Sequence, residues 1–269
     1  MKSIWSNTPT WIKAIIYVIV LLYPILIFNQ SLIINNLSVL PSMPWALFIC
    51  LCTLWLFWQF CTGAPIPFGA SEYRKHMSST QAPPYNSRVS VLSISIALFL
   101  FVYAINAVGF GLFGTDQTAQ LAFIKLVGSA SGISGPALLL AAALTAGVVE
   151  EIVFRGYIQR LMTIHYGVIV SFIFVAIIFT IGHLLPPELY LQYFLVSIAF
   201  SWVTHCIGSI VPGIIVHILF DFSAFLLVRS GSALAEPSYL ADHMMISSLF
   251  TVLFAVLLYL LASRLSTRQ

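Results

Sequence analysis

Eight long runs of predominantly apolar residues constrain this chain more than any other feature of its sequence. About 20 apolar residues in a helix cross the hydrocarbon core of a bilayer. Backbone amides inside lipid must be satisfied within their own segment, which a helix achieves, and the runs lack the short alternation of a transmembrane β-barrel. We therefore expect an all-α membrane protein with about eight transmembrane helices. The predicted spans are Trp11–Phe28, Pro44–Cys61, Val89–Phe113, Pro136–Phe154, Gly167–Leu185, Leu189–Ile207, Ile210–Val228 and Met244–Ala262.

The charge content excludes a water-soluble protein. Only 7% of the residues are charged and 60% are hydrophobic, whereas a soluble domain carries about 25% charged residues. The net charge of +3 comes without a basic cluster, so we expect the lipid bilayer as a partner and no nucleic acid. The cysteines lie in or beside apolar runs, which favours small apolar packing residues over disulfides or metal ligands. They are Cys50, Cys52, Cys61 and Cys206.

The chain divides into three segments by position of its spans and loops. Residues 1–135 hold three spans and their loops, 136–228 hold spans four to seven, and 229–269 hold a loop and the final span. Lys2 and Lys13 precede the first run, but no small-residue cleavage site follows Phe28, so we expect a first span rather than a signal peptide. The Pro-containing stretch Thr62–Arg88 is expected to be a loop, and an interfacial helix is expected around Leu121–Val127.

The basic residues predict the orientation of the spans. Lys and Arg favour cytoplasmic loops. With the N-terminus inside, nine of the 11 Lys and Arg residues lie inside, and only Lys125 and Arg229 fall outside. We therefore expect an integral multi-pass protein with both termini in the cytoplasm, in the plasma (inner) membrane if the source is bacterial.

Ionisable residues inside the spans are concentrated in the second half of the chain. A buried charge costs a few kcal/mol on insertion scales and usually marks function or a paired network. The fourth span holds Glu150, Glu151 and Arg155, and the fifth ends with His183. Glu151 and Arg155 are four residues apart and share a helix face, while Glu150 points about 100° away. One carboxylate can thus be held by the guanidinium while its neighbour faces a cavity.

The seventh span adds His217 and Asp221, also four residues apart on one face. A carboxylate shielded from bulk water can draw a proton from a water molecule, and an imidazole can orient that water or protonate a leaving amine. A second imidazole can stabilise an oxyanion. No Ser or Cys stands in a nucleophile motif, so these groups indicate hydrolysis of an acyl bond by direct attack of water.

The same side chains could instead hold a metal ion. Two His and two or three carboxylates suit zinc, although the H-E-x-x-H signature of soluble zinc proteases is missing. Zinc therefore remains open as a cofactor, with Glu150, His183, His217 and Asp221 as candidate ligands.

Three short motifs resemble one known family. Glu150 to Arg155 fits E-E-x-x-x-R, Phe179 to His183 fits F-x-x-x-H, and His217 to Asp221 fits H-x-x-x-[ND]. In this order, within consecutive apolar helices, they resemble the CPBP family of CAAX prenyl proteases, bacteriocin-processing enzymes and Abi relatives.

The resemblance implies an eight-span intramembrane endopeptidase bundle whose catalytic core is 136–228. It makes Glu150 and His183 the groups that activate water, with Glu151 and Arg155 in support. His217 and Asp221 match the pair that stabilises the oxyanion. Asp221 departs from the Asn of the prenyl protease branch. A peptide or protein substrate at the membrane is implied, prenylated or carrying a leader.

Structural roles for these residues, and functions other than proteolysis, are alternatives to the endopeptidase interpretation. Glu151 with Arg155 can be a structural ion pair, and Phe179 is expected to be cavity wall. His205 is expected to be structural. The leading hypothesis is an endopeptidase whose cavity opens to the cytoplasmic leaflet. The alternatives are a proton-coupled transporter, which the lack of an internal repeat disfavours, and a non-catalytic scaffold that binds peptides in the membrane.

Overall fold

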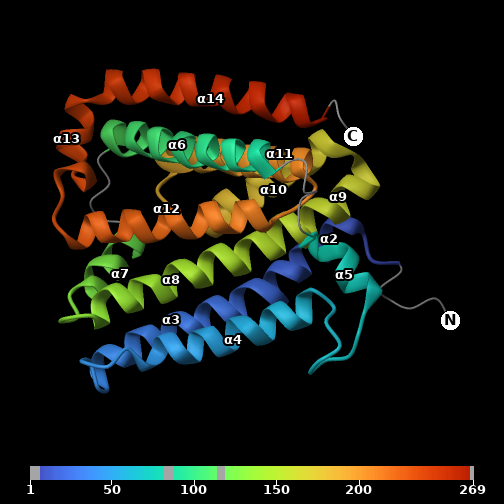
Figure 1. Ribbon diagram of the computed structural model, residues 1–269, viewed down its shortest axis with the longest axis horizontal. Helices are drawn as coiled ribbons and strands as arrows, with labels where there is room; N and C mark the ends of the chain where they lie inside the picture. Colours follow the sequence, from blue (N-terminus) through green and yellow to red (C-terminus); the bar gives the residue numbers. More distant parts are fainter. Residues whose placement is uncertain (1–6, 82–87, 114–118, 267–269) are drawn as a thin grey trace.

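The computed structural model is a bundle of helices (Figure 1). It describes residues 7–81, 88–113 and 119–266, and no strand occurs among them. Six helices are long and apolar enough to cross a membrane. Two shorter apolar helices, α4 (Trp45–Cys61) and α10 (Val168–Gly182), coincide with the second and fifth predicted spans. The all-α membrane fold is confirmed, while the count of eight spans stays a prediction.

The remaining elements follow in chain order. They are α2 (Thr10–Tyr17), the π-helical η1 (Val18–Leu22), α3 (Tyr23–Ser38), α5 (Glu72–Ser78), α6 (Arg88–Phe113), α7 (Ala119–Gly128), α8 (Ser134–Glu150), the π-helical η3 (Glu151–Ile158), α9 (Gln159–Tyr166), the 3-10 turn η4 (Pro187–Leu189), α11 (Tyr190–Ile207), α12 (Val211–Arg229), the 3-10 turn η5 (Ala233–Ala235), α13 (Pro237–Asp242) and α14 (Met244–Ser266). The loop expected at Thr62–Arg88 thus contains α5, with 82–87 outside the described residues. The helix expected around Leu121–Val127 is present as α7.

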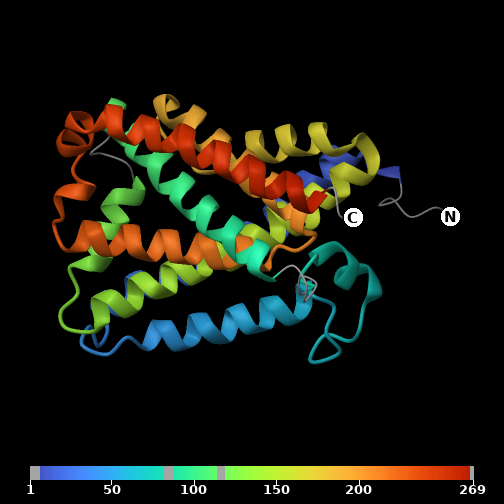
Figure 2. The ribbon, with the colours of Figure 1, turned by 45° about the horizontal axis from the view of Figure 1, so that its top comes forward.

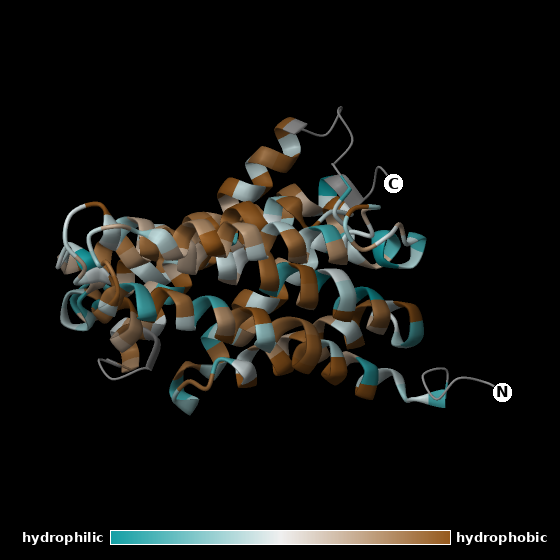
Figure 3. Ribbon diagram, turned by 90° about the horizontal axis from the view of Figure 1, so that it is seen from below, coloured by the Kyte–Doolittle hydropathy of each residue, from teal (hydrophilic) through white to brown (hydrophobic). Residues whose placement is uncertain are grey.

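The long helices lie roughly side by side along one direction (Figures 1 and 2). Helix α14 packs against α6 at one side, α3 packs against α4 at the other, and α8 contacts both α12 and α4 between them. We call the end that carries α5 and α9 the α5 end, and the opposite end, with α7 and α13, the α7 end. The start of α2 and the end of α14 both lie at the α5 end (Figure 1). Most strongly polar residues gather toward these two ends (Figure 3).

One continuous helix of 33 residues, formed by α8, η3 and α9, runs through the centre of the bundle. The helix extends past Phe154, where we expected the fourth span to end, through the buried Arg155 to Tyr166. Arg155 is tolerated inside this helix because Glu151 is its buried ionic partner. Close packing against α12 depends on Gly147, where a Cβ atom would lie 2.6 Å from Ile218 Cγ1. Small residues commonly permit such approaches in membranes.

A turn at Gly167 folds α10 back along this central helix. Gly167 has a φ of +84°, a region that glycine adopts without a steric cost. Glu150 precedes the turn by 17 residues and His183 follows it by 16. At about 1.5 Å per residue, both lie about 25 Å from the turn. Glu150 and His183 therefore lie at similar depths, although they belong to different helices.

Candidate active site

An ion pair between Glu151 and Arg155 forms the base of the site in η3. Nη1 of Arg155 lies 3.1 Å from Oε1 of Glu151, and both side chains are fully buried. A buried charge of either sign requires a partner, so each side chain makes the other tolerable in the bundle. The π-helical form of η3, with all eight residues buried, was not visible in the sequence. Such segments often coincide with functional sites.

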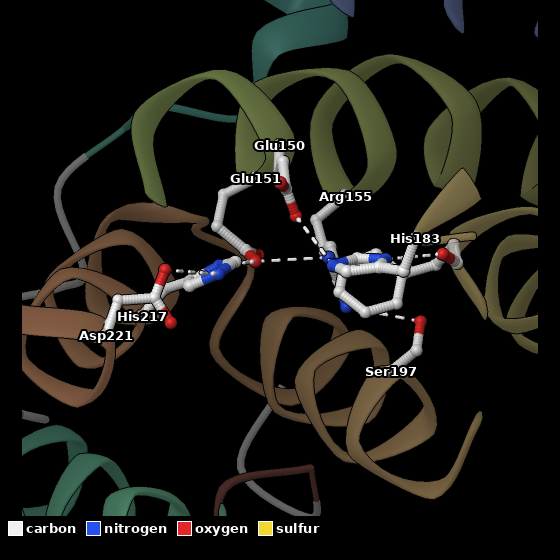
Figure 4. Close-up of polar contacts among 8 residues, drawn as sticks. Glu150, Glu151, Arg155, His183, Ser197, His217 and Asp221 are labelled. Atoms are coloured by element: carbon white, nitrogen blue, oxygen red, sulfur yellow. Dashed lines mark hydrogen bonds and ion pairs between the residues drawn. The ribbon is translucent and has the colours of Figure 1, made fainter. Parts of the chain in front are cut away.

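His217 joins this pair from α12. Its Nδ1 lies 2.9 Å from the same Oε1 of Glu151, and its Nε2 lies 3.5 Å from Oδ2 of Asp221 (Figure 4). An ionised carboxylate only accepts, so Nδ1 of His217 donates to Glu151. The helix approaches closely because Gly213 has no side chain. A Cβ atom at Gly213 would lie 3.3 Å from Oε2 of Glu151.

Glu150 and His183 form a second pair. Oε2 of Glu150 lies 3.8 Å from Nε2 of His183, which is too long for a direct hydrogen bond. Nδ1 of His183 lies 2.7 Å from the carbonyl oxygen of Phe179, and a carbonyl only accepts. This contact places the proton of a neutral imidazole on Nδ1 and leaves Nε2 as an acceptor facing Glu150. Oε2 of Glu150 has no hydrogen-bond partner among the described residues.

Helix α11 supplies three further side chains that no motif in the sequence indicated. Ser197 accepts a hydrogen bond of 3.2 Å from Nη2 of Arg155. The ring of Phe200 lies 5.2 Å from the Arg155 guanidinium carbon and 5.6 Å from the His217 ring. The ring of Tyr193 lies 4.9 Å from the His183 ring. The spacing of positions 193, 197 and 200 is that of one helix face, which is the only signal the sequence offers for them.

Phe179 lines the cavity and also contacts charged and aromatic side chains of the site. Its ring lies 4.6 Å from the guanidinium carbon of Arg155 and 4.4 Å from the ring of His183. A guanidinium over an aromatic face is stabilised by the ring quadrupole, most strongly where water is excluded. Phe179 therefore contacts both pairs of the site with its side chain, and its carbonyl orients His183.

A cavity of about 610 Å³ connects these groups. The five residues proposed for catalysis line it, and so do the two supporting residues. They are Glu150, Glu151, His183, His217 and Asp221, with Arg155 and Phe179. The structure thus brings acids and imidazoles from three separate helical segments to one pocket. Their catalytic roles stay predictions.

The other four histidines lie elsewhere. His205 is exposed on α11 and packs against Phe172, with ring centroids 5.8 Å apart. His76 contacts Arg160, and His165 and His243 contact carbonyl oxygens within their own helical turns. None of the four lines the cavity.

The donor atoms do not suit a metal ion. Among the described residues, no group of three or more His, Cys, Asp and Glu side chains has an arrangement that could hold one. Both nitrogens of His217 already face carboxylates, and Nδ1 of His183 faces a backbone carbonyl. A zinc ligand needs a nitrogen lone pair aimed at the metal. We therefore derive no chemical step through zinc.

A comparison with protein families finds a similarity in the central segment. Residues 132–223 match the family of Rce1-like type II CAAX prenyl endopeptidases. The chain is similar to this family over about a third of its length. The match includes all three motifs and covers most of the predicted catalytic segment 136–228. No match was found among curated proteins or among solved structures. The matched family consists of endopeptidases.

Proposed function

We propose that this chain is an intramembrane endopeptidase in which Glu150 and His183 activate the water that attacks the peptide bond. The observation that carries the proposal is the 3.8 Å separation of Oε2 of Glu150 and Nε2 of His183 at the cavity wall. A water oxygen can lie about 2.8 Å from both atoms at once. Both atoms accept, so the water donates its two protons to them and directs a lone pair into the cavity.

The attack follows from this arrangement. The water oxygen bonds to the carbonyl carbon while one of its protons passes to Glu150, which gives a tetrahedral intermediate with an anionic oxygen. The carbon–nitrogen bond then breaks, and the proton held by Glu150 passes to the leaving amine. A carboxylate can act in this way as base and then as acid when its proton affinity suits both steps.

In this proposal His217 stabilises the oxyanion. Its Nδ1 is held by Glu151, while the 3.5 Å distance from Nε2 to Asp221 leaves the second nitrogen weakly engaged. A doubly protonated ring can direct its Nε2–H to the developing oxyanion. Three carboxylates and one guanidinium meet around this cavity, so a cationic His217 reduces the excess of buried negative charge. Arg155 supports the arrangement by holding Glu151.

A cleavage assay that requires no previously known substrate tests the proposal. Purified protein in detergent is incubated with peptides from a digested membrane proteome, to which a farnesylated CAAX peptide and its unprenylated form are added. New peptide termini are then identified by mass spectrometry. We expect new termini with the wild type and none with Glu150→Gln or His183→Ala. Identical peptide sets for the wild type and both variants would reject the proposal. Cleavage of the added peptides shows whether a prenyl group is required.

The same assay separates the alternatives. A non-catalytic scaffold retains peptides without producing new termini. A proton-coupled transporter would show pH-driven flux in proteoliposomes, whereas an endopeptidase should show none. We favour the endopeptidase, because acids and imidazoles from three helices line one cavity and the sequence has no internal repeat of the kind common in transporters.

A further inference from the structure

The active-site cavity extends toward one end of the bundle only. Beyond the site itself, the cavity is lined on α8 by residues that precede Glu150 and on α12 by residues that follow Asp221. These residues are Ala142, Thr145, Ala146, Ala224, Phe225 and Val228. The end of α12 and the start of α8 lie together, since Nη1 of Arg229 lies 3.1 Å from the carbonyl oxygen of Ala130. The seven residues from Asp221 to Val228 correspond to about 10 Å of helix. The cavity therefore runs from the site toward the α7 end.

Exposed residues mark where the cavity reaches the surface. Ile27 and Leu184 both line it, with 60% and 85% of their area exposed. Gln30 lines it beside them and is exposed as well. Leu121 of α7 lines its far part. All four lie between the level of His183 and the α7 end, so the opening is on that half of the bundle.

The opposite side of the site is closed by packing. Phe154, Arg155, Phe179 and Phe200 form the floor of the cavity. Beyond this floor the side chains of η3 are buried, and α5 lies against that segment. A Cβ atom at Gly156 would lie 2.9 Å from the carbonyl oxygen of Ser78, so the backbones are in direct contact there. Among the described residues, none of α2, α5 or α9 lines the cavity.

The two ends of the bundle differ in charge. The α5 end carries Lys13, Arg74, Lys75, Arg160 and Arg264, with Glu72 as its acidic residue among the described side chains. The α7 end carries Lys125 and Arg229 beside three acidic residues, which are Glu188, Glu236 and Asp242. Lys and Arg near the ends of spans favour the cytoplasm. The α5 end is therefore the cytoplasmic one.

We propose that the active-site cavity is reached from the extracytoplasmic side of the membrane, and that its substrate is a peptide segment of a membrane-anchored precursor presented there. The mostly apolar wall between Asp221 and α7 suits a precursor whose chain remains in or beside the lipid next to the cleaved bond. The choice of substrate rests on the proposed endopeptidase function, whereas the side of access does not. The cavity opening thus differs from the cytoplasmic one expected from the sequence.

Thiol labelling from one side of the membrane tests the side of access without any activity. Cysteine is placed in the cavity by Ala224→Cys and, as a second variant, by Ala146→Cys. Ser129→Cys marks the α7 end and Lys75→Cys marks the α5 end, since both positions are exposed. The wild type gives the background from its own cysteines. A membrane-impermeant maleimide is applied to intact cells or spheroplasts and, separately, to inverted vesicles, and a permeant maleimide shows that every introduced thiol can react.

We expect the two cavity thiols and Ser129→Cys to react in the intact cells, and Lys75→Cys to react only in inverted vesicles. Reaction of both cavity thiols from the Lys75 side would overturn the proposal. So would a reversed labelling of Ser129→Cys and Lys75→Cys, or cavity thiols that react with the permeant reagent alone. If access is confirmed but the cleavage assay finds no new termini, the endopeptidase function fails while the side of access stands.

Discussion

Oε1 of Glu151 lies 2.9 Å from Nδ1 of His217, a contact that joins two helices across 66 positions of the sequence. The same oxygen lies 3.1 Å from Nη1 of Arg155. One carboxylate oxygen thus fixes both a guanidinium and an imidazole, and the second oxygen has no hydrogen-bond partner among the described residues. The position of His217 in the cavity therefore depends on the charge balance of η3.

Arg155→Met should destabilise the protein strongly. The substitution preserves much of the side-chain volume but leaves Glu151 as a buried charge without its cationic partner. Removal of one member of a buried ion pair costs about 3–5 kcal/mol. We expect a loss of this size in the free energy of unfolding, measured by denaturant titration in detergent. Arg160→Met is the control, because Arg160 is partly exposed and contacts His76 and Ser79 at the α5 end.

A double substitution checks the cause. If the loss arises from the unpaired carboxylate, Arg155→Met combined with Glu151→Gln should recover part of the stability of the single variant. Equal or greater destabilisation in the double variant would show that packing of Arg155 against its aromatic neighbours, rather than its charge, is responsible.

Gly213→Ala should lower both stability and turnover. The new methyl group would lie 3.3 Å from Oε2 of Glu151 and 3.6 Å from the Phe200 ring, so it pushes α12 away from η3. Overpacking of this kind costs about 1–3 kcal/mol, against a gain of about 1 kcal/mol from the better helix propensity of Ala. Thermal unfolding and the rate of peptide cleavage report the two effects.

Gly128→Ala is the matched control for this change. Its methyl group would lie 3.5 Å from Cβ of Arg229, an ordinary contact far from the cavity floor. We expect its turnover to equal that of the wild type. If Gly213→Ala also behaves like the wild type, the close approach of α12 is not needed to position Glu151.

Metal chelation should leave cleavage unchanged. Both nitrogens of His217 and Nδ1 of His183 are engaged by carboxylates or a carbonyl, so too few donors remain for a zinc site in this arrangement. Turnover is measured before and after treatment with a chelator, together with the metal content of the purified protein. Loss of turnover that returns on addition of zinc would contradict the donor geometry described here.

Much of the site could be predicted because its residues break the rule that spans avoid charge. Glu150, Glu151, Arg155, His217 and Asp221 stand out in apolar helices, and a helical repeat of 3.6 residues fixes which of them share a face. Ser197, Phe200 and Gly213 could not be selected in the same way. Their residue types are ordinary in membrane helices, and their roles come from the neighbours that tertiary packing gives them.

The length of the central helix was the main error in the fold, and it had a specific cause. We ended the fourth span at Phe154 by counting about 20 apolar residues. The helix continues because Arg155 is accommodated by Glu151, Ser197 and the Phe179 ring, contacts that only the folded chain contains. The longer helix brings Glu150 to the level of His183, since both lie about 25 Å from the turn at Gly167.

Asp221→Asn should keep most of the activity, whereas Asp221→Ala should lose it. The Oδ2 atom of Asp221 lies 3.5 Å from Nε2 of His217, and an Asn side chain has nearly the same shape and can still bond to the ring. Asn also stands at this position in the prenyl protease branch that the sequence resembles. Without any polar group, Nε2 of His217 loses its orientation toward the oxyanion, and loss of one such interaction typically costs about 10²–10³ in kcat.

The kinetic constants of the two variants distinguish orientation from charge. If orientation matters, Asp221→Asn retains a kcat within about tenfold of the wild type while Asp221→Ala falls by about 10²–10³. KM should change little in either variant, because an interaction made mainly in the transition state affects kcat rather than ground-state binding. Equal losses of kcat for Asn and Ala would instead mean that the negative charge of Asp221 itself is required, as expected if it keeps His217 in its cationic form during the attack.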